Sequence, residues 1–260
     1  MMKYLLPVLL LFLGLGCALH KGNNSNDQPK ARIYLLMGQS NMAGRGVVTD
    51  EYKNISNNRV LMLTDKSEWT TAKHPIHFDK PKVAGVGPGL AFGIQLAQAF
   101  PKDTIYLVPC AVGGTSIAKW EPTAFDKATN THPYDDAVIR IKEAMKKGKI
   151  EGVIWLQGEA DSNPKSAAIY LDKLHNLIAR VRALTQNPKL PFVVGELGQY
   201  RKNYNLINTQ LHLLPSKIPF TGVVTSEGLT HKGDTTHFDS PSATEYGSRF
   251  ATGMLKLLKP

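Results

Sequence analysis

Short, unbroken runs of apolar residues recur along the chain, and each run ends at a glycine or a polar turn. The runs cover residues 33–37, 105–108, 153–156, 192–194 and 222–225. Unbroken apolarity over about four or five residues is typical of strands that are covered on both faces. Because segments with helical spacing separate the runs, we expect these strands to be parallel.

Segments with a helical period lie between the apolar runs. The clearest covers residues 166–185, where large apolar side chains form one stripe, and further helices are predicted at 88–100, 135–147 and 243–258. This alternation predicts an α/β fold, a three-layer α/β/α sandwich around a central, mostly parallel five-stranded sheet. In such sheets ligands bind beyond the carboxyl ends of the strands. Polar residues that directly follow a strand are therefore the first candidates for function.

The first residues differ from the rest of the chain. Lys3 precedes an apolar run that ends just before Cys17. The run is shorter than the ~20 residues of a membrane-spanning helix and predicts a signal peptide at residues 1–17. Its end resembles the cleavage box of bacterial lipoproteins, so we expect an exported protein whose Cys17 carries a lipid anchor. Ordinary cleavage near Ala18 is the alternative.

The remaining chain is expected to contain a tether and a domain. Residues 18–30 are polar and predict a tether that holds the domain at the periplasmic or the outer side of a membrane. Residues 31–260 are long enough for a single domain with one sizeable core. The formal charge of +10 comes from lysines and arginines spread along the chain, without a basic run interleaved with aromatics, which argues against nucleic acid as a partner.

Two polar segments follow the first two predicted strands. GQSNMAG at 38–44 puts Ser40 at the start of the segment after the first strand, where its hydroxyl faces the crevice and its N–H can meet an oxyanion. The paired Gly113 and Gly114 after the second strand let the backbone approach a ligand, and the Gly114 N–H is a second candidate donor. Helix capping by Ser40 and a plain turn at the glycines are the competing interpretations.

The third strand ends directly in Gln157, Gly158 and Glu159. Gln157 can offer its side-chain NH2 to an oxyanion, while Glu159 is expected either to orient a neighbour or to cap a helix. Near the C-terminus, Asp234 and His237 stand three residues apart, which brings a carboxylate beside an imidazole. Asp234 can then orient His237 as the general base for a serine.

A metal site is the rival interpretation of this C-terminal segment. His231, Asp234 and His237 are spaced by threes and together could supply two imidazoles and one carboxylate. Gly233 interrupts the helix that would align the three side chains. We therefore favour the serine mechanism.

Together these segments resemble the SGNH hydrolases, in particular the sialate O-acetylesterase and acetylxylan esterase group, carbohydrate esterase family 6. The matching motifs are GQSNMAG at 38–44, VPCAVGGTSIAKW at 108–120, WLQGEAD at 155–161 and DTTHF at 234–238. The resemblance implies that Ser40 is the nucleophile, with His237 and Asp234 completing the triad. It also implies an oxyanion hole made by Ser40, Gly114 and Gln157. Gln39 stands where wider SGNH members carry Asp, and Gln39, Gly113 and Glu159 are expected to support the site.

The resemblance further implies a serine esterase that removes acetyl groups from sugars and needs no metal or organic cofactor. The expected partner is an acetylated carbohydrate, either O-acetylated sialic acid or an acetylated polysaccharide such as xylan. Trp120 follows the Gly114 loop and is a candidate for stacking on a sugar ring. Two rival functions are a metal-dependent sugar deacetylase and a surface lipoprotein that binds glycans without turnover.

Overall fold

The structure is a computed structural model that describes residues 1–2 and 28–259. The predicted signal peptide, Cys17 and most of the predicted tether fall on residues 3–27, outside the described residues. In the part of the chain that is described, no helix is both long enough and apolar enough to cross a membrane.

A seven-stranded sheet forms the centre of the fold, with strand order β3-β2-β4-β1-β5-β6-β7. The strands are β1 (Ala31–Gly38), β2 (Val60–Leu63), β3 (Trp69–Thr71), β4 (Thr104–Pro109), β5 (Ile150–Leu156), β6 (Phe192–Gly195) and β7 (Thr221–Val224). Among these strands, β3 is the antiparallel one, paired to β2. The five predicted strands are β1, β4, β5, β6 and β7, and the predicted count was too low by β2 and β3. β3 has only three residues, which is too short for a period to show.

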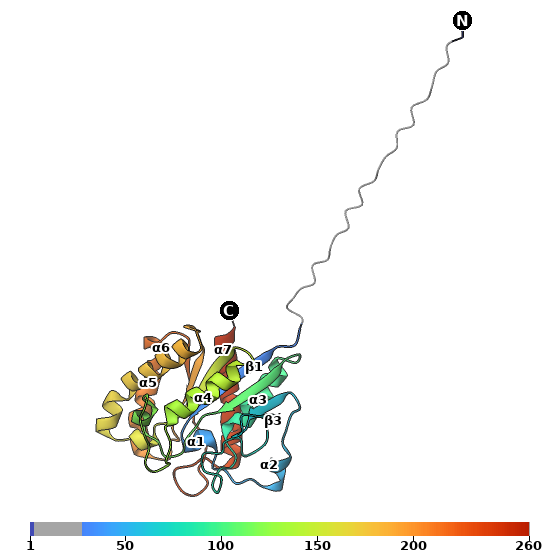
Figure 1. The fold of residues 1–260 in the computed structure, drawn as a ribbon. Coiled ribbons are helices and arrows are strands. Elements are labelled where there is room, and N and C mark those ends of the chain that lie inside the picture. The colour runs from blue at the N-terminus through green and yellow to red at the C-terminus, as the bar shows by residue number, and fades with distance from the viewer. Residues whose placement is uncertain (3–27, 260) are drawn as a thin grey trace.

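Helices cover both faces of this sheet and complete the predicted three-layer sandwich (Figure 1). They are α1 (Ser40–Ala43), α2 (Asp50–Asn54), α3 (Pro88–Ala99), α4 (Pro133–Met145), α5 (Pro164–Leu184), α6 (Asn205–Lys217) and α7 (Ser240–Leu258). The four predicted helices correspond to α3, α4, α5 and α7, and α6 was not predicted. In Figure 1, α5 and α6 pack against each other on one side of the sheet.

Two hydrophobic clusters bury the two faces of the sheet. Side chains alternate between the faces of a strand, so that Leu35 of β1 packs with α4, α5 and α6, while its neighbour Leu36 packs with α3 and α7. Both leucines are fully buried. Burial on both faces explains why the central strands are continuous apolar runs, as the sequence pattern indicates.

The carboxyl ends of the three central strands bring the predicted motifs together. Gly38, the last residue of β1, pairs with Leu156, the last residue of β5. Gly38 has a φ of +136°, and a Cβ there would lie 2.1 Å from the carbonyl oxygen of Leu156, so only glycine fits. The residues that follow, Gln39 and Gln157, therefore leave adjacent strands side by side.

Candidate active site

A chain of two hydrogen bonds joins Ser40, His237 and Asp234. Ser40 is the first residue of α1, and its Oγ lies 3.0 Å from Nε2 of His237. On the other side of the ring, Nδ1 of His237 lies 2.7 Å from Oδ2 of Asp234. The residues are 197 positions apart for the first bond, so the fold brings together what the sequence separates. This is the arrangement in which an imidazole accepts a proton from a hydroxyl.

The surroundings keep the acid charged and the base neutral. Burial raises the pKa of Asp234, but hydrogen bonds from the backbone and ring of His237 and from the Thr236 N–H outweigh it, so the pKa falls well below its usual range. Burial lowers the pKa of His237, and the hydrogen bond and charge of Asp234 offset only part of that effect. A neutral imidazole next to a carboxylate has one nitrogen free to accept a proton.

Asn41 holds the loop that carries His237. Its Nδ2 donates to Oε1 of Glu159 at 2.6 Å and to the carbonyl oxygen of Thr236 at 3.0 Å, and its Oδ1 accepts from the Phe238 N–H at 3.0 Å. Asn41 thus binds the backbone of Thr236 and Phe238, the residues on either side of His237. The sequence analysis did not identify Asn41 as a site residue, although its position directly after Ser40 could have indicated that it lies in the site.

The glycine loop after β4 is held in place from one side by a buried ion pair. The Gly113 N–H donates to Oδ2 of Asp79 at 2.8 Å, and the same oxygen accepts from Arg45 at 2.7 Å. Gly114, with a φ of +90°, lines the same cavity as Ser40. The Gly113 N–H is used by Asp79, so of the two glycines Gly114 is the one whose N–H stays a candidate oxyanion donor. Asp79 and Arg45 lie on irregular segments with no motif, and sequence reasoning missed them.

The structure contradicts the predicted position of Gln157. Its side chain is fully buried, and Nε2 donates to the carbonyl oxygen of Thr115 at 3.0 Å, to Oδ2 of Asp161 at 2.7 Å and to Oε1 of Gln39 at 3.2 Å. Both amide hydrogens are therefore engaged inside the protein. The Gln157 side chain therefore links Gln39, Thr115 and Asp161 inside the protein and does not face an oxyanion. The end of the neighbouring strand β1 contributes Gln39 to the cavity wall in its place.

Trp120 is also not at its predicted position. The indole is fully buried, packs edge-on against Trp155 at 5.1 Å between ring centroids, and donates from Nε1 to Oγ1 of Thr115 at 3.2 Å. A sugar cannot stack on a ring that has no exposed face. Trp120 is a core residue whose hydrogen bond to Thr115 fixes the residue that follows Gly114.

Glu159 lines the cavity next to Ser40, with an unusual carboxyl group. Its Oε1 accepts from Asn41, whereas its Oε2 is shut off from solvent without a hydrogen-bond partner. Burial raises the pKa of Glu159 to about 7, despite that hydrogen bond. The expectation that Glu159 orients a neighbour agrees with its contact to Asn41, and Glu159 is not an N-cap.

A cavity of about 520 Å³ opens over Ser40 and His237. Besides the residues described above, cationic side chains form much of its wall, namely Arg45, Lys80, Arg201 and Lys232. Arg45 is paired with Asp79, and Lys232 lies 3.9 Å from Asp234. Lys80 and Arg201 form no ion pair with a carboxylate among the residues that the structure describes. Nζ of Lys80 lies 3.8 Å from where a Cβ of Gly114 would stand, so this charge is close to the glycine loop.

The rival metal site does not assemble. Nδ1 of His231 accepts from the backbone N–H groups of Gly233 and Thr235, at 3.0 and 3.2 Å, and its ring packs on Tyr200. Within residues 1–2 and 28–259, no three His, Cys, Asp or Glu side chains are grouped as metal ligands. Asp234 and His237 bind each other and Ser40 instead.

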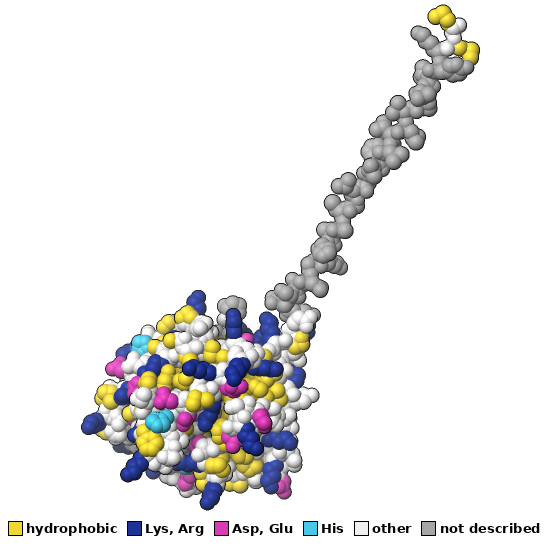
Figure 2. All heavy atoms as spheres, viewed as in Figure 1, with side chains coloured by type: hydrophobic (Ala, Val, Ile, Leu, Met, Phe, Trp, Pro, Cys, Tyr) yellow, Lys and Arg dark blue, Asp and Glu magenta, His cyan; other side chains and the backbone are white. Residues whose placement is uncertain are grey.

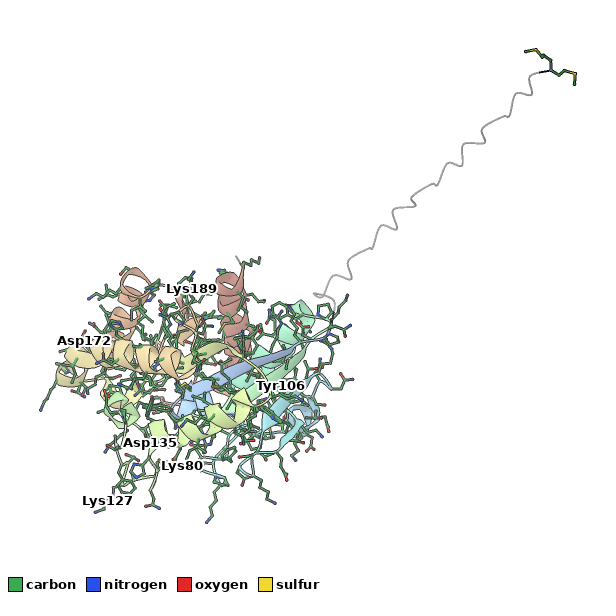
Figure 3. All side chains as sticks on the ribbon, turned by 45° about the horizontal axis from the view of Figure 1, so that its top comes forward. Lys80, Tyr106, Lys127, Asp135, Asp172 and Lys189 are labelled. Atoms are coloured by element: carbon green, nitrogen blue, oxygen red, sulfur yellow. The ribbon has the colours of Figure 1, made fainter. Side chains whose placement is uncertain are left out.

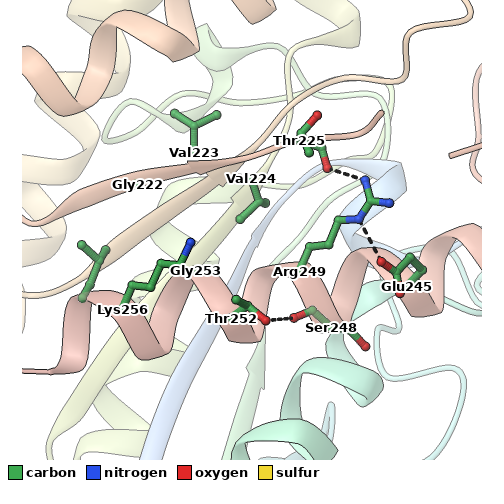
Figure 4. A pocket seen from close by; sticks show the side chains of 11 residues that line it. Gly222, Val223, Val224, Thr225, Glu245, Ser248, Arg249, Thr252, Gly253 and Lys256 are labelled. Atoms are coloured by element: carbon green, nitrogen blue, oxygen red, sulfur yellow. Dashed lines mark hydrogen bonds and ion pairs between the residues drawn. The ribbon is translucent and has the colours of Figure 1, made fainter. Parts of the chain in front are cut away.

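A second groove lies between β7 and α7 (Figure 4). Arg249 crosses it and donates to the carbonyl oxygen of Thr225 at 3.0 Å and to Glu245 at 2.9 Å. Ser248 is part of the wall, but no described lining residue is a histidine that could activate it. The groove therefore offers no counterpart to the arrangement around Ser40.

Comparisons with known proteins point to one family. A family model described as "Carbohydrate esterase, sialic acid-specific acetylesterase" matches residues 30–256. The probable carbohydrate esterase At4g34215 of Arabidopsis thaliana is 32% identical over 249 residues, which cover 87% of this chain and 91% of that protein. Its solved structure aligns with a TM-score of 0.77 at 31% identity, covering 88% of this chain and 98% of that one.

More distant structures share the fold. The structure of NanS aligns with a TM-score of 0.69 at 19% identity and covers 88% of this chain and 98% of that chain. XAC1771, a carbohydrate acetylesterase from Xanthomonas citri, aligns with a TM-score of 0.68 at 18% identity, covering 87% of this chain and 56% of that one. At these identities the likeness concerns the fold alone.

Proposed function

The chain belongs to the carbohydrate esterase family described as sialic acid-specific acetylesterase, and from this premise we propose that it removes acetyl groups from sugars through an acetyl-enzyme on Ser40. The observation that carries the proposal is the hydrogen-bonded chain from Ser40 through His237 to Asp234. A hydroxyl, a neutral imidazole and a charged carboxylate in this order are the parts that serine esterases need.

In the first step Ser40 Oγ attacks the acetyl carbonyl carbon while its proton passes to Nε2 of His237. The carbonyl oxygen becomes an oxyanion, which the N–H groups of Ser40 and Gly114 stabilise. The Ser40 N–H is available because the first N–H groups of a helix have no intrahelical partner. When the tetrahedral intermediate collapses, the sugar oxygen leaves with the proton from His237, and the acetyl group stays on Ser40.

Water completes the cycle. His237, now neutral again, takes a proton from a water molecule that attacks the acetyl carbon. A second oxyanion forms in the same place, and its collapse returns the proton to Ser40 Oγ and releases acetate. Asp234 keeps the ring in the tautomer that leaves Nε2 free, and it stabilises the imidazolium during both steps.

The direct test compares the wild type with Ser40→Ala on a panel of acetylated sugars, with released acetate as the measurement. We expect Ser40→Ala to lose at least about 1,000-fold in kcat. Ser216→Ala, on the exposed side of α6, is the matched control and should retain full activity. Activity that survives in Ser40→Ala but is lost with EDTA would favour the metal-dependent deacetylase. Glycan binding by a wild type that releases no acetate would favour the non-catalytic lipoprotein.

Among acetylated sugars we propose an acidic one as the preferred substrate, such as O-acetylated sialic acid. The support is the charge of the cavity wall, where Lys80 and Arg201 form no ion pair with a carboxylate among the described residues. Glu159, which lines the cavity together with Asp234, has a pKa raised to about 7 by burial and so carries only part of a charge at neutral pH. Cationic side chains in a cleft raise the local concentration of anionic ligands.

A further inference from the structure

A second polar pocket adjoins the cavity over Ser40. We name it the β6 pocket, because the residues that line it begin directly after the last residue of β6, Gly195. Its volume is about 680 Å³, against about 520 Å³ for the cavity. The lining residues belong to the segment 196–202 and to α6. Arg201 lines both the β6 pocket and the cavity, so a ligand that fills one can extend into the other.

The sheet sets the separation between the β6 pocket and Ser40. Ser40 follows the turn at the end of β1, and β6 is two strands away from β1, with β5 between them. Adjacent strands of a sheet lie about 4.8 Å apart, so the ends of β1 and β6 are separated by about 10 Å. This is the scale of two joined sugar units. A disaccharide therefore has the length to occupy the cavity and the β6 pocket at once.

Hydrogen-bond acceptors in the wall of the β6 pocket come from Glu196 and His212. Glu196 is only 5% exposed. Burial raises its pKa, but hydrogen bonds from Ser226, Thr225 and His212 outweigh that effect, so the pKa of Glu196 falls below its usual range and the group is a carboxylate. Its Oε1 accepts from Nε2 of His212 at 2.5 Å, which in the neutral ring leaves Nδ1 as a second acceptor.

Hydrogen-bond donors in the same wall come from exposed side chains. Lys202 and Asn205 make no side-chain hydrogen bond within residues 28–259. Arg201 makes one long contact, from Nη1 to the hydroxyl of Tyr204 at 3.4 Å. An ammonium, a guanidinium and an amide therefore stand ready to donate, next to the acceptors.

This mixture of donors and acceptors fits a ligand that is rich in hydroxyl groups. A hydroxyl both donates and accepts hydrogen bonds, so the groups of a sugar can use all of these side chains. An apolar ligand would find Leu206 as the one large apolar side chain among the described lining residues. A compact anion would meet the charged carboxylate of Glu196. A neutral, polyhydroxylated unit avoids both conflicts.

We propose that the β6 pocket binds the sugar unit next to the acetylated one, so that the substrate is an acetylated oligosaccharide or glycan chain. The proposal rests on the proposed acetyl-enzyme at Ser40. With the acetyl group over Ser40, Arg201 stands between the two sugar units and can donate to both. These contacts lie away from the reacting carbon and are equal in the bound substrate and the transition state. They therefore lower KM and leave kcat nearly unchanged.

The test compares O-acetylated sialic acid as the free sugar with the same sugar linked to lactose, and measures KM from released acetate. We expect the KM of the wild type to be about tenfold lower for the linked sugar. Thr209 is an exposed lining residue of α6, so Thr209→Trp fills the β6 pocket. This variant should raise the KM for the linked sugar by about tenfold and keep the KM for the free sugar within about twofold.

Ser216→Trp is the matched control, because Ser216 is exposed on the same helix and does not line the β6 pocket. Two results would overturn the proposal: a wild type with equal KM for the free and the linked sugar, and a Thr209→Trp enzyme that treats both sugars alike. Full activity in Ser40→Ala contradicts the acetyl-enzyme instead. If neither sialic acid substrate is hydrolysed, the same ratio is measured with acetylated xylose and acetylated xylotriose, which separates the β6 pocket from the identity of the sugar.

A binding measurement covers the case in which Thr209→Trp does not fold. Ser40→Ala protein labelled with ¹⁵N holds the substrate without turnover. Its backbone amide signals at Asn205 and Thr209 should move when the lactose-linked sugar is added and stay in place with the free sugar. Signals that ignore the linked sugar, or that move equally with both sugars, would contradict the proposal.

Discussion

Glu159 has the most unusual charge state in the cavity wall. Its pKa is raised to about 7 by burial, and one carboxylate oxygen has no hydrogen-bond partner. In an unfolded chain the same carboxyl group titrates near pH 4.5. Between these two values the folded protein binds a proton that the unfolded chain does not. The contribution of Glu159 to stability is therefore complete below pH 4.5 and is lost as the pH rises through about 7.

This difference predicts how stability changes with pH. Glu159→Gln has no carboxyl group to titrate at this position. The free energy of unfolding of the variant minus that of the wild type should therefore be about 2 to 3 kcal/mol larger at pH 8 than at pH 5. The measurement is urea unfolding of both proteins at the two pH values. A difference between them that does not change with pH would mean that Glu159 titrates normally in the folded protein.

The glycine loop after β4 depends on a pair of charges from another part of the chain. Asp79 and Arg45 are almost fully buried, with 1% and 5% of their side chains exposed, and Asp79 also accepts from the Gly113 N–H. Burial raises the pKa of Asp79, but the hydrogen bond and charge of Arg45 outweigh it, so the carboxyl group stays ionised. Asp79 thus holds the loop and also neutralises Arg45. If the Asp79 carboxylate moved away, the Arg45 guanidinium would remain buried without a counter-charge.

Asp79→Asn should therefore destabilise the protein by about 3 to 5 kcal/mol, because Arg45 is left buried without a counter-charge. We also expect kcat to fall, since the Gly114 N–H loses its fixed position. Urea unfolding and esterase kinetics measure the two effects. Asp50→Asn is the matched control, because Asp50 is 92% exposed and its pair with Lys53 contributes little. Equal unfolding midpoints for Asp79→Asn and wild type would show that the pair does not stabilise the fold.

On one face of the molecule the positive charge is dispersed, whereas in the cavity it is concentrated. Figure 2 shows lysine and arginine side chains scattered over the visible face, with acidic residues between them. The cavity wall differs because Lys80 and Arg201 have no acidic partner among the described residues. In Figure 3, Lys80 lies on the side of the molecule away from the start of β1.

This concentration of charge predicts a salt effect that depends on the substrate. Salt screens charges beyond about 3 Å at 1 M, so the KM for O-acetylated sialic acid should rise several-fold between about 0.02 and about 0.5 M NaCl. The KM for an uncharged acetylated xylo-oligosaccharide should stay constant. Lys80→Ala should reduce the salt effect, while Lys189→Ala should not, since Lys189 is exposed on the opposite side of the view in Figure 3. Equal salt dependence for both sugars would contradict the preference for an acidic substrate.

Many features of the site could be predicted because they follow from strand ends. Ser40 and Gly114 each belong to a segment directly after an apolar run, and parallel strands place such segments at one edge of a sheet. The two short strands β2 and β3 were missed, and so were Asp79 and Lys80, which belong to segments without a period. Gln157 and Trp120 were identified as important residues, but their predicted orientations were wrong.

The amino-acid sequence by itself determined the layers of the sandwich and the residues at the ends of its central strands, because periodicity and glycine positions are local properties of the chain. It also determined that Asp234 and His237 meet, since three positions of a turn separate them. Only the tertiary structure decided which of the two glutamines, Gln39 or Gln157, faces the cavity. That choice depends on the acceptors that surround Gln157, which come from segments elsewhere in the chain and satisfy its buried amide.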